Sequence, residues 1–178
     1  LATASFGHGI TTTLLQLAKA YSIVVNGGYQ IKPKLVKNNN NEKKEKILSQ
    51  DLSREILPIL RKIVSTKDGT ASLANVNGYE IGGKTGTAEK SADGEYSNKK
   101  INSFVSVFPT SKPKFVLAVM LDEPKINENY IYHYRDGSNI KYKGTPFNTA
   151  GWTTVEATGQ IVEKIGPILA TKYSEFNF

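Results

Sequence analysis

The stretch Gly82-Gly83-Lys84-Thr85-Gly86-Thr87-Ala88 decides how this chain is interpreted, because such residues occur in two unrelated structures. One is an extended strand with an accessible edge, and the other is a phosphate-binding loop that leads into a helix. A Lys-Thr-Gly triplet alone arises from composition in roughly a few per cent of chains of this length. The residues around the triplet must therefore decide between the two structures.

The segment from Gly78 to Thr85 satisfies G-x-x-x-x-G-K-[ST], the pattern of a nucleotide-binding P-loop. The apolar run Val116 to Leu121, followed by Asp122-Glu123, even imitates a strand that ends in metal-binding carboxylates. A P-loop, however, needs a buried strand before it and a helix directly after it. Asn75-Val76-Asn77 is not the core of a strand, and residues 86–94 lack an apolar helical stripe. The sequence therefore favours an extended segment and disfavours an NTPase.

Two helices are predicted before this stretch. Thr11-Thr12-Thr13 precede an apolar stripe with helical spacing, and Gly27 can end that helix. Ser49 can cap the second helix, which contains Pro58 well inside it, where a proline kinks a helix. The first stripe is Leu14, Leu17, Ala18, Tyr21, Val24 and Val25, and the second is Leu52, Ile56, Ile59, Leu60 and Ile63.

An antiparallel sheet is predicted from the middle of the chain. The apolar runs Asn102 to Phe108 and Phe115 to Leu121 are joined by a hairpin over Pro109 to Pro113. We expect Glu80 to Glu89 to form a strand that pairs with the first of these runs. Both runs are apolar on both alternating faces, so helices are expected to cover both faces of the sheet.

The remaining segments complete an α+β plan in one domain that spans residues 1–178. Asn38 to Asn41 is a polar connection between two parts of this domain. Asn127 to Gly144 is rich in Tyr, Asn and Gly and predicts a long loop. A closing amphipathic helix is predicted from Val155, Ile161, Val162, Ile165, Ile168 and Leu169.

Composition excludes several classes of protein. The chain has no cysteine, which excludes disulfide scaffolds, thiolate zinc sites and cysteine nucleophiles. Its longest apolar stretch, Phe115 to Leu121, is far short of the ~20 residues that span a bilayer. The net charge of +7 is scattered, and Glu45 interrupts the run Lys43 to Lys46. We expect a solvated basic surface, compatible with anionic wall polymers or lipid head groups, and no nucleic-acid partner.

Motifs on both sides of Lys84 follow one another in the order and spacing of a known family. They are Ser5-Phe6-Gly7-His8-Gly9, the helix segment Leu15 to Tyr21, Asn26-Gly27-Gly28, Ile47-Leu48-Ser49, Val64, Gly69-Thr70-Ala71, Gly78-Tyr79, Asp122-Glu123-Pro124 and Thr149-Ala150-Gly151-Trp152. Across essentially its whole length the chain resembles the class B penicillin-binding proteins, and its ending resembles the division-type members. The resemblance implies the C-terminal part of one penicillin-binding transpeptidase domain, an antiparallel sheet flanked by helices.

The chemistry that this resemblance implies is acyl transfer from a D-Ala-D-Ala stem peptide through an acyl-serine, without a cofactor or a metal. Lys84 would supply positive charge for the substrate carboxylate and for proton transfer, and Thr85 and Thr87 would offer hydroxyls to that carboxylate. Gly86 would let an extended substrate lie against the strand edge. The backbone N–H of Thr87 would be one of two oxyanion-hole donors. β-Lactams, which mimic D-Ala-D-Ala, would be trapped as an acyl adduct.

The family's nucleophile motif, Ser-x-x-Lys, has two matches here, Ser97 to Lys100 and Ser111 to Lys114. Both follow the Lys-Thr-Gly strand in polar or turn segments, whereas the family's nucleophile precedes it at a helix start, so neither is expected to be the nucleophile. No Ser-x-Asn occurs. We therefore expect the first two motifs upstream of Leu1. Leu14 and Val155-Glu156 depart from the family's usual residues, but neither change touches the active strand.

The resemblance also implies a parent protein anchored by an upstream segment at the periplasmic face of the bacterial inner membrane. Division or elongation membrane proteins are the expected partners. A degenerate, non-catalytic transpeptidase-like module that serves as a division scaffold or binds the wall is the alternative.

The other chemically notable residues receive plain structural interpretations. His8 and His133 have no acidic or histidine partner at ligand spacing and are expected to be loop residues rather than metal ligands. Asp122 and Glu123 are expected to end a strand and to pair with nearby lysines. Trp152 is expected to be a core or hinge anchor rather than a substrate platform.

Overall fold

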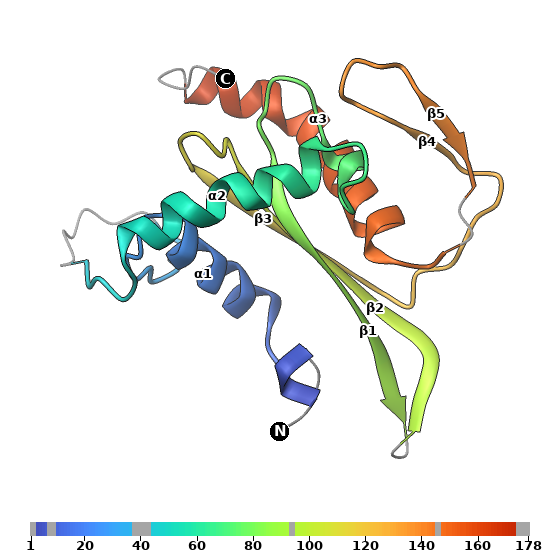
Figure 1. Cartoon of the computed structure of the whole chain (residues 1–178), viewed down its shortest axis with the longest axis horizontal. Coiled ribbons are helices and arrows are strands. Elements are labelled where there is room, and N and C mark those ends of the chain that lie inside the picture. The colour runs from blue at the N-terminus through green and yellow to red at the C-terminus, as the bar shows by residue number, and fades with distance from the viewer. Residues whose placement is uncertain (1–2, 7–9, 37–43, 93–94, 145–146, 174–178) are drawn as a thin grey trace.

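The computed structural model describes residues 3–6, 10–36, 44–92, 95–144 and 147–173. Within them, three α-helices, five strands and three short 3-10 helices follow one another along the chain (Figure 1). The elements are η1 (Thr3–Phe6), α1 (Leu14–Val25), α2 (Gln50–Ser65), η2 (Ser72–Ala74), β1 (Gly82–Ala92), β2 (Glu95–Phe108), β3 (Phe115–Asp122), β4 (Ile131–His133), β5 (Lys141–Lys143), η3 (Ala150–Trp152) and α3 (Thr154–Lys172).

Helices α1 and α2 begin where their capping residues predict. Thr13 forms a capping box with Gln16 at the start of α1, and the Ser49 hydroxyl accepts a hydrogen bond from the Leu52 N–H (3.2 Å) at the start of α2. After α1 the chain turns through Gly27 and Gly28, whose φ values of +89° and +88° favour glycine. No helix among these described segments is long and apolar enough to cross a membrane.

The sheet has the antiparallel order β1-β2-β3, with β2 in the centre. Thr85 lies opposite Phe104, which confirms the predicted pairing, although β1 begins at Gly82 rather than at Glu80. Strand β2 begins seven residues before the predicted run Asn102 to Phe108. Figure 1 shows the β1–β2 ribbon projecting past the end of β3.

The two faces of the sheet pack against different helices, as the apolar pattern predicts. On one face, Phe104 and Phe108 are buried with Val155 and Val162 of α3. On the other face, Val107 is buried with apolar residues of α1 and α2, namely Val25 and Leu60. The alternation of side chains along β2 therefore joins the chain's early helices to its last one across a single sheet.

Residues 127–144 are not simply a long loop, and that prediction was wrong. They contain β4 and β5, which pair as an antiparallel ribbon with Tyr132 opposite Tyr142. Gly137 and Asn139 adopt positive φ in the turn between the strands. Tyr132 is buried against Trp152, with ring centroids 5.1 Å apart, so tertiary packing stabilises strands that are too short to show an alternating pattern.

A buried ion pair connects this ribbon to α3. The guanidinium of Arg135 donates two hydrogen bonds of 2.9 Å to the carboxylate of Glu156, and both side chains are only 6% exposed. Burial alone would lower the pKa of Arg135, but the hydrogen bonds and charge of Glu156, aided by those of Glu163, raise it. Burial also raises the pKa of Tyr130 to about 12, and the hydrogen bond from its hydroxyl to Glu156 adds to this effect.

We predict that Glu156→Gln in the full-length protein destabilises the β4–β5 ribbon and α3 by roughly 3–5 kcal/mol, because it leaves the Arg135 charge buried without its main partner. Glu163→Gln is the matched control, since Glu163 contacts the same guanidinium (3.1 Å) but its side chain is 59% exposed. The control should cost no more than about 1 kcal/mol. Hydrogen–deuterium exchange of peptides from the ribbon and α3 measures the difference, and equal protection in the two variants would contradict it.

Candidate active site

The Lys-Thr-Gly strand lies directly against the backbone of α2. A Cβ on Gly82 would lie 3.0 Å from the backbone nitrogen of Arg61 and 3.0 Å from the carbonyl carbon of Leu60. The Arg61 guanidinium donates a hydrogen bond to the carbonyl of Ile81 (2.7 Å), just before the strand. A Cβ on Gly83 would lie 2.5 Å from the Val105 carbonyl oxygen. Glycine is thus required at both positions by close approach, and β1 is held at its first residues.

Beyond these glycines, the candidate side chains divide between the two faces of the sheet. Thr85 and Thr87 share the face of Phe104, whereas Lys84 lies on the face that α1 and α2 cover, as the register and the two-residue period require. Lys84 is exposed, and its Nζ donates to the carbonyl of Thr85 (2.9 Å). Gly86, between the two threonines, adds no side chain to the strand. The arrangement agrees with the expectation that the two threonines lie on one face.

Two contacts behind the threonines were not predicted. The Thr85 hydroxyl lies 3.4 Å from the hydroxyl of Thr70, and the Ala150 N–H donates to the Thr87 hydroxyl (3.1 Å). Thr70 follows the turn after α2, and Ala150 begins η3. Segments on both sides of the strand in sequence therefore orient its hydroxyl groups.

A buried asparagine on the central strand helps to hold η3 in this position. Asn102, opposite Thr87, donates to the side chains of Asn148 (3.2 Å) and Thr153 (2.9 Å). Its Oδ1 is the one buried side-chain polar atom without a partner in the described part of the chain. An asparagine within the run Asn102 to Phe108, which was predicted to be buried, was the available sequence signal for a polar contact there.

Neither Ser-x-x-Lys match lies at the start of a helix, where the family's nucleophile is expected. Ser97 and Lys100 lie on strand β2, where residues three apart point to opposite faces, whereas on a helix they would share one. The Ser97 hydroxyl instead donates to the Lys90 carbonyl (2.9 Å). Ser111 lies in the β2–β3 hairpin, where its N–H donates to Glu80 (3.1 Å).

The P-loop alternative fails on geometry, because Lys84 and Thr85 lie within strand β1 and no helix begins directly after them. The carboxylates that imitated a metal site form ion pairs, as expected. Lys90 Nζ lies 2.7 Å from Asp122 and 2.8 Å from Glu123. These hydrogen bonds raise the pKa of Lys90, and Lys90 in turn lowers the pKa of Glu123.

His133 lies in strand β4 and Trp152 in η3. His133 is an exposed residue of β4, while His8 lies outside the described residues. No group of three or more acidic, histidine or cysteine side chains in the described segments is placed to hold a metal ion. Trp152 packs between Tyr132 and Tyr142, with centroid distances of 5.1 and 5.2 Å, as an anchor would.

This arrangement can be compared with known proteins. The family model "Penicillin binding protein transpeptidase domain" matches residues 1–140. The chain belongs to this penicillin-binding transpeptidase family. Among solved structures, the TP domain of Burkholderia pseudomallei penicillin-binding protein 3 matches with a TM-score of 0.74 and 29% identity, over 97% of this chain and 46% of that chain. The match confirms the predicted α+β fold.

Curated relatives extend the similarity beyond residue 140. The probable peptidoglycan D,D-transpeptidase FtsI of Caulobacter vibrioides is 33% identical in an alignment of 183 residues that covers 97% of this chain and 28% of that protein. Stage V sporulation protein D of Bacillus subtilis is 37% identical in an alignment of 137 residues that covers 70% of this chain and 21% of that protein. The chain thus spans less than a third of the length of these transpeptidase-family relatives.

We predict that alanine destabilises the protein more at one glycine of the strand than at another. Gly83→Ala should destabilise the sheet by about 1–3 kcal/mol or more, because the new Cβ meets the Val105 carbonyl and the buried Phe104 ring. Gly86→Ala should cost less, since its Cβ meets only the Ser103 hydroxyl (2.6 Å), which can rotate away. Thermal unfolding of the full-length variants compares them. Adding Ser103→Ala should remove the remaining cost at Gly86, and equal destabilisation by both glycine substitutions would contradict the prediction.

Proposed function

We propose that the protein containing this chain is a peptidoglycan D,D-transpeptidase, and that β1 is its substrate-binding strand. The observation that carries the proposal is the Lys84-Thr85-Gly86-Thr87 segment on an edge strand, with an exposed lysine and two hydroxyl groups held from behind. Its family membership and its similarity to a probable D,D-transpeptidase support the same function. An extended peptide that ends in a carboxylate suits such an edge, because main-chain pairing and a charge partner are both available.

In the proposed reaction, a serine hydroxyl attacks the carbonyl carbon of the penultimate D-alanine, and the terminal D-alanine leaves. The acyl group then passes to an amine of a neighbouring stem peptide, and the serine is regenerated. Thr85 and Thr87 bind the substrate carboxylate from one face, and Lys84 contributes positive charge from the other. The Thr87 N–H stabilises the negative charge that develops on the attacked carbonyl oxygen. Gly86 keeps the edge open for the peptide.

The serine, its lysine and the Ser-x-Asn motif are proposed to lie upstream in the same protein. The two Ser-x-x-Lys matches lie on strand β2 and in the β2–β3 hairpin rather than at a helix start, and the chain corresponds to only part of its relatives. By the same similarity, we propose an enzyme at the periplasmic face of a bacterial inner membrane, with division or elongation membrane proteins as its partners and β-lactams as its inhibitors.

We predict that Lys84→Ala in the full-length protein slows acylation by a fluorescent penicillin about 10²-fold or more, because it removes a charge that stabilises the transition state. Lys99→Ala is the matched control, since Lys99 is an exposed lysine on the neighbouring strand β2. Thr85→Val should weaken binding and leave the fold intact. Rates come from gel fluorescence at short times, and a wild-type rate in the Lys84→Ala protein would refute the proposed site.

The 178 residues alone should form no covalent penicillin adduct, because Ser97 and Lys100 point to opposite faces of β2 and Ser111 lies in a hairpin turn rather than at a helix start. Size-exclusion chromatography should show self-association, since the outer edge of β3 has no partner strand in the described sheet. Intact-mass spectrometry after β-lactam treatment tests the first expectation. A stoichiometric adduct on either serine would contradict the assignment of the nucleophile to an upstream segment.

A further inference from the structure

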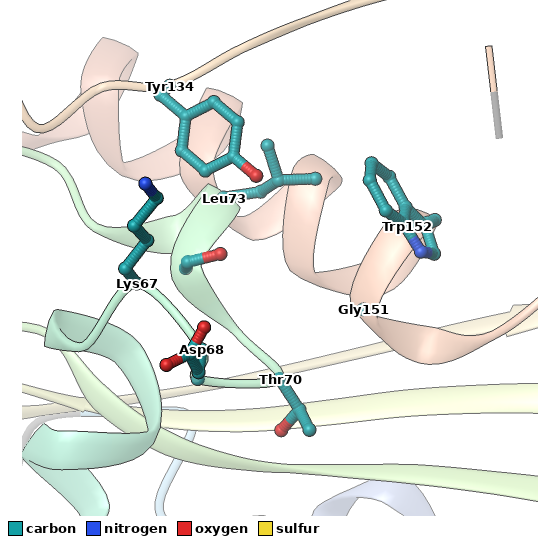
Figure 2. A pocket seen from close by; sticks show the side chains of 9 residues that line it. Lys67, Asp68, Thr70, Leu73, Tyr134, Gly151 and Trp152 are labelled. Atoms are coloured by element: carbon teal, nitrogen blue, oxygen red, sulfur yellow. The ribbon is translucent and has the colours of Figure 1, made fainter. Parts of the chain in front are cut away.

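A polar pocket of about 200 Å³ lies behind the candidate strand. It is bordered by the turn after α2, by η2, by Tyr134 after β4 and by η3. Figure 2 shows Lys67 and Tyr134 on one side of the pocket and Trp152 on the other, with Asp68 and Thr70 below them. The pocket has no role in the reaction proposed above.

The pocket is connected to the strand through two of its own lining residues. Thr70 lines the pocket, and its hydroxyl lies 3.4 Å from that of Thr85. Gly151 also lines it and directly follows Ala150, whose N–H donates to the Thr87 hydroxyl. A molecule in the pocket would therefore lie one residue behind the Thr85 hydroxyl and two residues behind the Thr87 hydroxyl, the groups proposed to bind the substrate carboxylate.

Two adjacent residues give the pocket one positive and one negative charge. Lys67 and Asp68 both line it, both are exposed, and neither forms an ion pair within 4.0 Å in the described structure. Their turn is held rigidly, since the Gly69 N–H donates to the Thr66 carbonyl (3.0 Å) and a Cβ on Gly69 would lie 2.2 Å from the Ile63 carbonyl oxygen. The turn thus presents two opposite charges that do not neutralise each other.

The other walls suit a small aliphatic group. Trp152 is fixed by its contacts with Tyr132 and Tyr142, and Leu73 beside it is almost completely buried. The volume is sufficient for a single small amino acid and too small for a disaccharide or an extended peptide. Opposite charges on neighbouring residues of this turn, beside an apolar wall, are complementary to a molecule that carries an ammonium and a carboxylate on one carbon.

We propose that this pocket binds an α-amino-acid zwitterion, with the carboxylate at Lys67 and the ammonium at Asp68. The proposal rests on the transpeptidase function, whose acylation step releases free D-alanine, a zwitterion of this class. Occupation of the pocket would add an amino-acid subsite next to the carboxylate-binding hydroxyls.

The test is NMR titration of the full-length protein with ¹³C-labelled D-alanine, before and after acylation by penicillin. Binding should persist after acylation, because the pocket is separate from the strand edge. Lys67→Gln and Asp68→Asn should each weaken it about tenfold or more, since each removes a charge-assisted contact. Lys62→Gln and Asp51→Asn are the matched controls, the same chemical changes at exposed positions of α2 outside the pocket, and should bind D-alanine normally. Acetate and methylamine, which carry one charge each, should not compete.

Absence of zwitterion binding to the wild type, or binding unchanged in both pocket variants, would overturn the proposal. Penicillin labelling is read separately, so a protein that is labelled but binds no zwitterion refutes only the pocket, and an unlabelled protein refutes the transpeptidase function.

Discussion

The close packing of α2 against the first residues of β1 is the constraint on which the candidate site depends. A Cβ on Gly82 would lie 3.0 Å from the backbone of α2 and 2.6 Å from the methyl group of Thr110, and at Gly83 the buried Phe104 ring fills the space beneath the strand. Arg61 closes the same contact by binding the carbonyl of Ile81. An edge strand is ordinarily the most deformable part of a sheet, so this attachment gives Lys84 a fixed position without a partner strand on its outer side.

A second constraint acts at the opposite side of the same strand, through buried polar groups. Besides Glu156, the Arg135 guanidinium binds the carbonyl of Leu73 in η2 (3.2 Å). It thereby joins the β4–β5 ribbon, α3 and the segment that follows Thr70. Because a buried charge is costly unless it is paired, these elements are held together at one point. The Thr70–Thr85 contact is thus supported by two attachments, that of Arg61 to the carbonyl of Ile81 before β1 and that of Arg135 to the carbonyl of Leu73 in η2.

How much of this was accessible from the sequence depended on the range of each interaction. The helices were predictable from capping residues and apolar spacing. The strand at Lys84 was predictable because no helical stripe follows it, which excluded a P-loop although the P-loop pattern matches. The β4–β5 ribbon was missed because three-residue strands carry too little alternation to detect. The Arg135–Glu156 pair spans 21 residues and the Thr70–Thr85 contact 15, and no local period encodes either. The strand of the candidate site was therefore predictable, and its supporting contacts were not.

The two outer edges of the sheet differ in a way that explains why only one of them suits a substrate. Over Lys84 to Thr87 of β1, the residues are exposed or half-buried and comprise a lysine, two threonines and a glycine, so a peptide that pairs with this edge meets polar groups and can leave again. Along β3, Met120 and Leu121 are 50% and 36% exposed, and the residues before them are half-buried and apolar. Pairing with that edge would bury apolar surface at roughly 25 cal/mol per Å², which favours a permanent neighbour over an exchanging ligand. The proposed transpeptidation releases a product at every turnover and therefore needs the polar edge, on which the Lys-Thr-Gly segment lies.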